Sequence, residues 1–340
     1  SWRTELKHGV LSGFSKALIE PERLTVGELL QEHNYHTAFI GKWHLGWDWH
    51  ITRPWNWKSG PLGTVEDPEV DFRQPVQNGP NERGFHYSYG FSGSLDMPPY
   101  VYVKNGLATT IPEDSTVCVD TKGFWRKGLT GTDFSHADVL QHLTDKASEY
   151  ISDRSRKDQP FFLYFALSAP HTPILPAKEF MGKSNTNFYG DFVLQVDDVV
   201  GQIVSAVEKS RTRNHTIIIF TSDNGCSPRA NFSELQKVGH YPSYIFRGKK
   251  ADIYEGGHRV PFILSWPDSV RSGSKSDAMI CTTDLMATLA DILDYSLPDN
   301  AGEDSYSFLP VLKGRSDQEN LREAIVHHSL HGRFAIRRGN

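Results

Sequence analysis

The sequence predicts an α/β fold, in which an open sheet carries helices on both faces. Residues 161–167 and 216–221 are nearly continuous apolar runs, which is typical of strands buried on both faces. Between these runs, Val193, Val196 and Val200 recur at helical spacing within 188–209. Alternation of helices with buried strands favours this fold class, in which ligands bind beyond the carboxyl ends of the strands.

The other elements follow in chain order. Residues 25–32 are expected to form a helix because Val26, Leu29 and Leu30 share one helical face. Residues 36–41 read as a short strand that ends in a glycine turn. The Gly-, Pro- and aromatic-rich stretch 47–133 predicts long loops with short strands. The last three predicted elements are a helix at 137–152, a buried strand at 260–266 and a helix at 283–293.

Length and charge exclude several classes of protein. The 340 residues suffice for one large domain, alone or with a small one. With 36 basic and 41 acidic residues the net charge is −5, which gives no electrostatic reason to expect a nucleic-acid partner. No apolar run reaches the roughly 18 residues of a membrane span. The three cysteines do not make a disulfide framework, and the first residues do not resemble a signal peptide.

Charged and imidazole side chains follow the predicted strands, where the fold class places ligands. Asp and Asn on one sharp turn are oxygen ligands that suit Ca²⁺ or Mg²⁺ better than zinc. Lysines can hold an oxyanion such as sulfate or phosphate, and histidines can act as general acid or base. Together these groups predict hydrolysis of a charged ester. The set is Lys42, His44, His171, Asp223, Asn224 and Lys250.

Several sequence blocks resemble those of the type I, formylglycine-dependent sulfatases, which belong to the alkaline phosphatase superfamily. The first is Gly-Lys-Trp-His-Leu-Gly at 41–46. The others are Asp-Asp-Val-Val-Gly at 197–201, Thr-Ser-Asp-Asn-Gly at 221–225 and the stretch 247–261, and all stand in the family's order. The resemblance runs from about residue 8 to residue 338. It implies an alkaline-phosphatase-like, mostly parallel central sheet flanked by helices at 1–300 and the start of a small α+β subdomain at 301–340.

The resemblance also implies roles for these residues in sulfate ester hydrolysis. Lys42 and His44 correspond to the pair that contacts the formylglycine nucleophile, with His44 assisting the final elimination. His171 and Lys250 correspond to the pair that binds sulfate and helps the leaving group. Asp223 and Asn224 correspond to half of the calcium site.

Two parts of the family's machinery are not found in the sequence. The C/S-x-P-x-R motif that yields formylglycine is absent, and the segment around Lys7 predicts that it would lie just upstream of Ser1. An N-terminal Asp-Asp pair that completes the calcium site is also missing. Cys226-Ser-Pro-Arg places its arginine one residue too early to be that motif. We therefore expect a fragment that is inactive alone, whose full-length form is matured by a formylglycine-generating or sulfatase-maturating enzyme.

Substrate contacts are expected in the loops. Tryptophans crowd 43–57, and exposed aromatic faces there, Trp47 among them, could stack on sugar or aryl rings, although core positions are the alternative. Asp96 and His240 are further candidates for substrate contacts, and Arg73 and His86 are weaker ones. A sulfated carbohydrate is favoured over an aryl sulfate because the loops are long and polar.

Two alternatives to a sulfatase stay open. A phosphatase or phosphonate monoester hydrolase of the same superfamily would use a similar metal and similar cations. A non-catalytic relic would bind sulfated glycans without turnover. The resemblance to the sulfatases implies a secreted, periplasmic or lysosomal location.

Overall fold

The computed structural model describes residues 10–53, 67–120, 122–314 and 321–339. The described residues up to Ala206 form one compact unit, here the first unit, and those from Val207 onward form the second unit. The elements of the first unit, in chain order, are α1 (Val26–Glu32), β1 (His36–Lys42), η1 (Asn81–Arg83), β2 (Tyr87–Phe91), β3 (Val103–Lys104), β4 (Leu107–Ala108), β5 (Asp114–Cys118), β6 (Trp125–Thr130), α2 (Val139–Arg154), β7 (Phe161–Ala166), η2 (Lys178–Phe180) and α3 (Phe188–Lys209), which crosses the boundary between the units.

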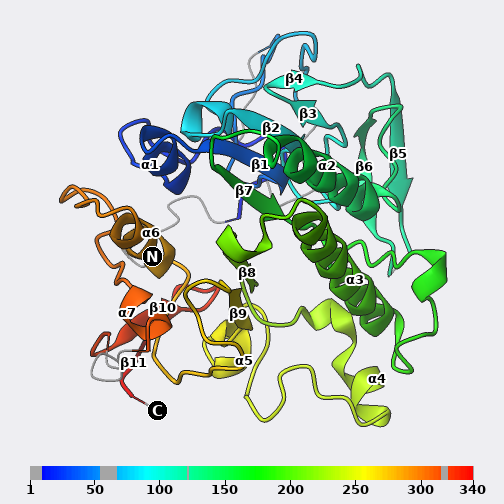
Figure 1. Ribbon diagram of the computed structural model, residues 1–340. Helices are drawn as coiled ribbons and strands as arrows, with labels where there is room; N and C mark the ends of the chain where they lie inside the picture. Colours follow the sequence, from blue (N-terminus) through cyan, green and yellow to red (C-terminus); the bar gives the residue numbers. More distant parts are fainter. Residues whose placement is uncertain (1–9, 54–66, 121, 315–320, 340) are drawn as a thin grey trace. The chain divides into compact units, whose positions relative to one another are not determined.

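A five-stranded sheet in the order β4-β3-β2-β1-β7 organises the first unit (Figure 1). β1 is parallel to both of its neighbours, β2 and β7, whereas β3 and β4 continue the sheet antiparallel. The interior residues of β1 are all buried, so the strand predicted at 36–41 and the α/β class are both confirmed. β7 lies at an edge of this sheet and is half-buried, with Tyr164 51 % exposed, because an edge strand has a neighbour on one side only.

Alternate side chains of β1 enter two different cores. Ala38 and Ile40 belong to a buried cluster with Leu143 of α2. Phe39 points to the other face and packs edge-on against Trp43, in a second cluster. This alternation is the period of two expected for a strand between two layers.

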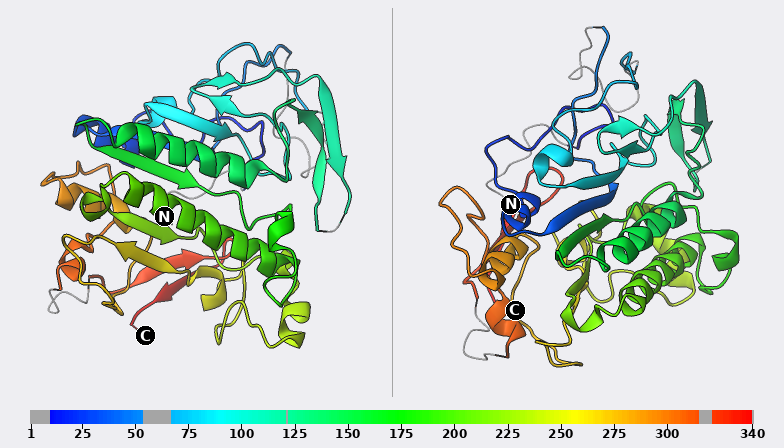
Figure 2. Two further views of the ribbon diagram at one scale, coloured as in Figure 1. Left: turned by 45° about the vertical axis from the view of Figure 1, so that its right-hand side comes forward. Right: turned by 45° about the horizontal axis from the view of Figure 1, so that its top comes forward.

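The predicted helices form where the sequence places them. The side chain of Thr25 accepts a hydrogen bond from Glu28 N, and the Glu28 carboxylate accepts one from Thr25 N, so a capping box starts α1. α2 and α3 lie side by side (Figures 1 and 2). The amides of Gln141 and Gln202 join them through hydrogen bonds of 2.9 and 3.2 Å.

The second unit contains short elements. In chain order they are η3 (Arg213–His215), β8 (Ile218–Thr221), η4 (Pro228–Ala230), α4 (Phe232–Lys237), α5 (Glu255–His258), β9 (Phe262–Ser265), α6 (Asp284–Ile292), α7 (Leu309–Leu312), β10 (Ile325–His328) and β11 (Phe334–Arg337). β8 pairs with β9, and β10 with β11, both antiparallel.

The strand predicted at 260–266 needs a correction. It exists as β9, but it runs antiparallel to β8, and Ile263 is 62 % exposed, so it is not a strand buried on both faces. A parallel partner requires a crossover connection, usually through a helix. The chain between β8 and β9 holds only short helices, of which α4 has six residues.

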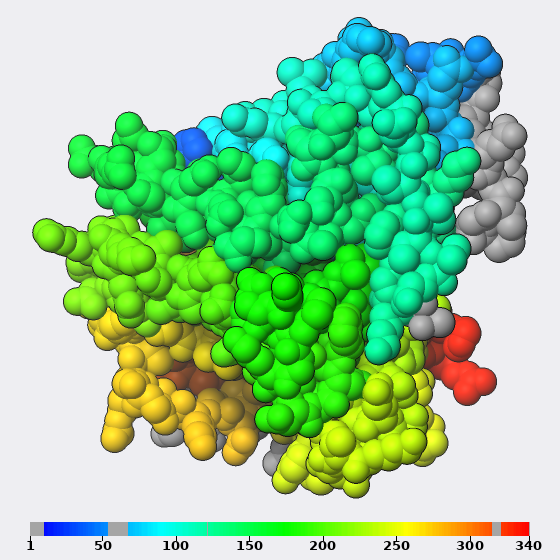
Figure 3. Space-filling view, turned by 90° about the vertical axis from the view of Figure 1, so that its right-hand side faces the viewer, coloured from blue at the N-terminus to red at the C-terminus, as the bar shows by residue number. Residues whose placement is uncertain are grey.

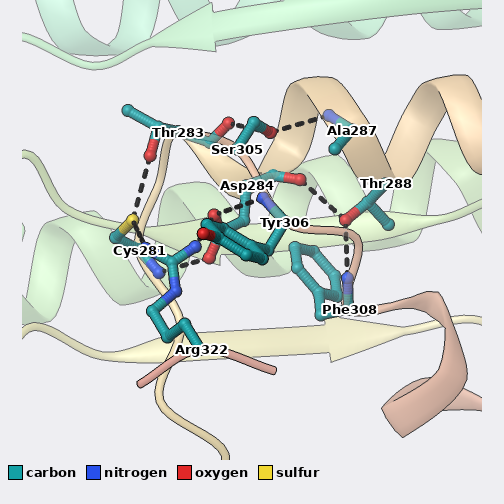
Figure 4. Close-up of polar contacts among 9 residues, drawn as sticks. All are labelled: Cys281, Thr283, Asp284, Ala287, Thr288, Ser305, Tyr306, Phe308 and Arg322. Atoms are coloured by element: carbon teal, nitrogen blue, oxygen red, sulfur yellow. Dashed lines mark hydrogen bonds and ion pairs between the residues drawn. The ribbon is translucent and has the colours of Figure 1, made fainter. Parts of the chain in front are cut away.

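A buried ion pair anchors the end of the second unit (Figure 4). The guanidinium of Arg322 contacts the carboxylate of Asp284 at the start of α6, and the two side chains are 5 % and 0 % exposed. The same carboxylate accepts hydrogen bonds from Cys281 N at 2.8 Å and Tyr306 N at 3.0 Å. The chain just before β10 is thereby fixed to the start of α6.

Other expectations can be compared with the described residues. Cys118, Cys226 and Cys281 form no disulfide bond with one another. No helix in the described ranges is long and apolar enough to cross a membrane. The subdomain boundary near residue 300 stays a prediction.

Candidate functional site

Three parallel strands of the first unit bring their carboxyl ends together. Lys42 is the last residue of β1 and pairs with Phe91, the last residue of β2. Gly41 pairs with Ala166, the last residue of β7. A Cβ on Gly41 would lie 2.0 Å from the Ala166 carbonyl oxygen, and its φ of +125° also favours glycine. The segments that follow these strands therefore all start at the same end of the sheet, where the carboxyl ends of the strands lie.

A chain of polar contacts links those segments. Lys42 Nζ donates to Ser94 Oγ at 3.4 Å, and Ser94 Oγ lies 3.1 Å from His171 Nδ1. His171 Nδ1 also lies 2.8 Å from the carbonyl oxygen of Thr172. Because a carbonyl oxygen can only accept, Nδ1 carries the proton, and Nε2 is the basic atom of the neutral ring. The structure thus brings Lys42 and His171 together, as the strand ends predicted.

Asp96 lies beside His171 and is held by Arg126 of β6. Its Oδ2 accepts from Arg126 Nη1 at 2.9 Å, and its carbonyl oxygen accepts from the same nitrogen at 2.7 Å. Its Oδ1 is 4.0 Å from His171 Nδ1 and, among the described residues, has no hydrogen-bond partner. Asp96 remains a predicted substrate contact, and the structure places its carboxylate, 12 % exposed, between a guanidinium and an imidazole.

Arg126 is a residue that sequence reasoning missed. It lies on the hairpin of β5 and β6, which appears in Figure 2 as a long two-stranded ribbon. Thirty positions separate it from Asp96, and no motif surrounds it. No local sequence signal could have found it, because the contact depends on how the hairpin folds back.

His44 is held as a neutral imidazole. Its Nε2 lies 2.7 Å from the carbonyl oxygen of Leu11, so Nε2 carries the proton and Nδ1 is the basic atom. Burial lowers the pKa of His44, the neighbouring Lys42 ammonium acts in the same direction, and the result is a pKa of about 4. His171 also contributes to this shift, which places all three side chains within one electrostatic neighbourhood.

The expectation of an exposed aromatic platform is wrong for the described tryptophans. Trp43, Trp47 and Trp49 are 6 %, 2 % and 8 % exposed and belong to one buried cluster. Trp47 and Trp49 pack edge to face, with ring centroids 5.4 Å apart. Trp47 is therefore a core residue, because the loop after β1 turns its aromatic rings inward. Trp55 and Trp57 lie outside the described residues.

The weaker candidates His86, Arg73 and His240 make other contacts. His86 precedes β2 and bonds the side chain of Thr37 at 3.0 Å, at the opposite end of the strands from Lys42. Arg73 is exposed and faces Asp71 at 4.0 Å. His240 belongs to the second unit, where it is exposed and its backbone N–H bonds the Leu235 carbonyl.

In the second unit, the turn after β8 carries Asp223 and Asn224. The turn packs closely on the segment around 256, because Gly225 N donates to Gly257 O at 3.0 Å. A Cβ on Gly225 would lie 1.8 Å from the Gly256 carbonyl oxygen, so only glycine fits. Lys250 joins the same assembly, since its backbone N–H donates to Cys226 O at 2.9 Å. The sequence blocks at 221–225 and 247–261 are therefore neighbours.

The oxygen donors of this turn suit a hard cation in part. Within the described ranges, no hydrogen bond or ion pair engages the side chains of Asp223 and Asn224, so their oxygens are available. Ca²⁺ takes six to eight oxygen ligands, so two side chains supply a fraction of a shell. No cluster of three or more His, Cys, Asp or Glu in the described part of the chain completes it.

Comparison with known proteins gives consistent matches. A family model described as Sulfatase matches residues 8–295. An N-acetylgalactosamine-6-O-sulfatase of Bacteroides thetaiotaomicron is 30 % identical over 375 residues, covering 99 % of this chain and 69 % of that protein. An arylsulfatase of Hemicentrotus pulcherrimus is 31 % identical, covering 88 % of this chain and 48 % of its own length. N-acetylgalactosamine-6-sulfatase of Mus musculus is 29 % identical, covering 85 % and 47 %. The chain thus spans about half the length of the last two relatives.

Solved structures match as well. One from work on the metabolism of multiple glycosaminoglycans by Bacteroides thetaiotaomicron has a TM-score of 0.83 at 29 % identity, covering 99 % of this chain and 73 % of that one. A Pseudoalteromonas sulfatase has a TM-score of 0.68 at 22 % identity, covering 99 % and 64 %, and supports the fold alone.

Proposed function

Because the chain belongs to the sulfatase family, we propose that it hydrolyses sulfate esters and that its substrate is a sulfated carbohydrate. The observation that carries this proposal is the contact chain from Lys42 through Ser94 to His171 at the carboxyl ends of parallel strands. A fixed ammonium can bind a sulfate oxygen, and an imidazole beside it can donate a proton to the ester oxygen of the leaving group.

Two lysines are the proposed anion-binding groups. Lys42 donates to Ser94 Oγ, a weak neutral acceptor that a sulfate oxygen could replace. Lys250 has no acidic partner among the described residues, so its charge is available to an anionic ligand. Charge-assisted hydrogen bonds to such an anion are roughly twice as strong as neutral ones.

His171 is the proposed proton donor to the leaving oxygen. As an imidazolium it would keep its Nδ1 proton on the Thr172 carbonyl and give the Nε2 proton to the ester oxygen. The carboxylate of Asp96, 4.0 Å from Nδ1, stabilises the positive ring. Arg126 holds that carboxylate in place through two hydrogen bonds, so it is a positioning residue.

His44 is the proposed base. Its Nδ1 can accept a proton near neutral pH because its pKa, lowered to about 4, keeps the ring neutral. In the proposed mechanism its Nδ1 would accept the proton of a hydroxyl group of the formylglycine hydrate.

Two groups that the family resemblance implies would complete the site. Formylglycine would supply the nucleophilic oxygen as its hydrate, and Ca²⁺ would polarise the sulfate. Asp223 and Asn224 would hold one side of the metal. Both groups, together with a maturation enzyme and a secreted, periplasmic or lysosomal location, belong to this proposal.

N-acetylgalactosamine 6-sulfate is the first substrate to test, because two of the relatives above are named for it. The protein expressed from its complete coding sequence should desulfate this sugar with a higher kcat/KM than p-nitrophenyl sulfate. Lys42→Ala should lower kcat/KM about 100-fold. Lys104→Ala, at an exposed position of β3, is the matched control and should leave it unchanged. Turnover of a phosphate monoester in place of both sulfates would reject the proposal, and so would tight sulfate binding without turnover.

A further inference from the structure

A pocket of about 310 Å³ lies in the second unit, next in sequence to Lys250. Its volume is at the lower end of the range of small-molecule sites, which suits one sugar ring. The segment that forms it, yellow-green in Figure 3, lies at the surface. Its lining consists of Phe232, Gln236, Tyr241, Pro242, Ser243, Tyr244, Phe246, Gly248 and Lys249.

The pocket wall is aromatic and open to a ligand. Tyr241 and Tyr244 are 58 % and 74 % exposed, and Tyr244 meets Phe246 edge-on at 6.3 Å. The backbone of Tyr244 has a φ of 52°, a conformation that a bulky side chain rarely adopts. A turn bond from Tyr244 N to Tyr241 O, 2.8 Å, fixes this arrangement. Exposed tyrosines offer a sugar an apolar ring face and a hydroxyl together.

One cation serves this pocket. The ammonium of Lys249 lies 5.8 Å from the centre of the Phe232 ring, and no carboxylate in the described part of the chain pairs with it. Its backbone N–H donates to Asp252 Oδ2 at 3.0 Å, which fixes the main chain and leaves the ammonium available. Lys249 lines the pocket and Lys250 does not, so the two adjacent lysines serve different places.

We propose that this pocket, whose lining ends one residue before the proposed sulfate-binding Lys250, binds a second, acidic sugar unit of the substrate. Lys249 would pair with its carboxylate or sulfate, and Tyr241 and Tyr244 would contact its ring. The inference rests on the function proposed above, and it names the substrate class as an anionic oligosaccharide. The adjacency of Lys249 and Lys250 in the sequence supports this proposal, because a single peptide bond joins the lysine of the pocket to the proposed sulfate-binding lysine.

The test compares a one-ring with a four-ring ligand. N-acetylgalactosamine 6-sulfate and a chondroitin 6-sulfate tetrasaccharide are given to the protein expressed from its complete coding sequence. Binding is measured by calorimetry and turnover by sulfate release. We expect Lys249→Ala and Tyr244→Ala to weaken binding of the tetrasaccharide about 10-fold each and to leave the affinity for the monosaccharide within about twofold. Val238→Ala, 52 % exposed in the same segment and outside the lining, is the matched control.

The outcomes separate the two proposals. Equal loss for both ligands would show that the variants act through the sulfate site or through folding, and it would overturn the pocket assignment. So would an unchanged affinity for the tetrasaccharide, or a concentration-dependent self-association that Tyr244→Ala abolishes. Binding of the tetrasaccharide that depends on Lys249, without sulfate release, would contradict the proposed function and support the pocket.

Discussion

The guanidinium of Arg126 holds Asp96 by two acceptors at once, the carboxylate at 2.9 Å and the main-chain carbonyl at 2.7 Å. The second bond fixes the backbone of Asp96 as well as its charge. The side chain that adjoins His171 is therefore positioned from a hairpin that is remote in sequence.

Arg126→Ala should lower kcat/KM for a sugar sulfate about 10-fold by loosening Asp96, and it should destabilise the fold by about 1–3 kcal/mol. Arg126→Lys keeps a charge but not both bonds, and should recover part of the activity. Kinetics and urea unfolding give the two values. A loss of stability with unchanged kinetics would make Arg126 purely structural.

His171→Gln should affect substrates unequally. A sugar alkoxide needs a proton to leave, whereas p-nitrophenolate does not, so kcat should fall about 100-fold for the sugar sulfate and much less for p-nitrophenyl sulfate. Asp96→Asn should show the same inequality in weaker form. Equal losses on the two substrates would rule out the proton-donor role and leave sulfate binding as the function of His171.

The turn after β8 should make turnover depend on Ca²⁺, because it carries the proposed metal ligands Asp223 and Asn224. Chelation should abolish turnover, and added Ca²⁺ should restore it. Gly225→Ala should weaken calcium affinity about 10-fold or more, because its Cβ displaces the turn that carries Asp223. Gly201→Ala is the matched control: nothing lies within 4 Å of its Cβ, and a helical position should be stabilised by about 0.5–1 kcal/mol. Calcium titration followed by intrinsic fluorescence measures both variants.

Acid should destabilise the folded protein between pH 6.5 and 4. Burial lowers the pKa of His44 and of His136 to about 4, so the unfolded chain takes up protons that the folded chain excludes. Stability is thus present above pH 6.5 and is lost as the pH falls, by about 3 kcal/mol for each residue. Urea unfolding at several pH values measures the slope. His136→Gln should flatten it, and an unchanged slope would exclude His136 as a source.

Asp284→Asn should cost about 3–5 kcal/mol, because it leaves the buried guanidinium of Arg322 without its counter-charge. Asp291→Asn, on the exposed side of the same helix, removes only the charge that accepts a surface hydrogen bond from Ser307 and should cost less than about 0.5 kcal/mol. Denaturant midpoints at constant m-value compare the two. Similar losses would mean that Arg322 finds another acceptor.

Local sequence patterns predicted most of the helices and strands correctly. The capping box at Thr25 and the valine spacing of α3 are local signals, and both helices formed where predicted. The direction of β9 was not predictable, because an apolar run does not say which neighbour it will meet. The tryptophans after β1 were ambiguous for a related reason, since an aromatic cluster suits a core as well as a surface.

The candidate site also contains residues that the sequence could place and residues that it could not. Lys42 and His171 could be placed together because each follows a parallel strand, and topology brings such ends together. Arg126 could not, since its contact with Asp96 depends on tertiary folding of a hairpin. The tautomers of His44 and His171 also required coordinates, because the carbonyls that fix them belong to Leu11 and Thr172.

Gly41 has a consequence for how this gene can vary. Its missing side chain lets β1 approach the Ala166 carbonyl, and Gly90 on the other side is equally constrained, with a would-be Cβ 2.0 Å from Gly41 O. In a saturation library, every missense codon at 41 should be depleted under selection for folding alone, before catalysis is tested. The codon for Lys42 should tolerate replacement under the same selection and fail only when growth depends on the enzyme. Two adjacent codons would then report separately on architecture and on chemistry.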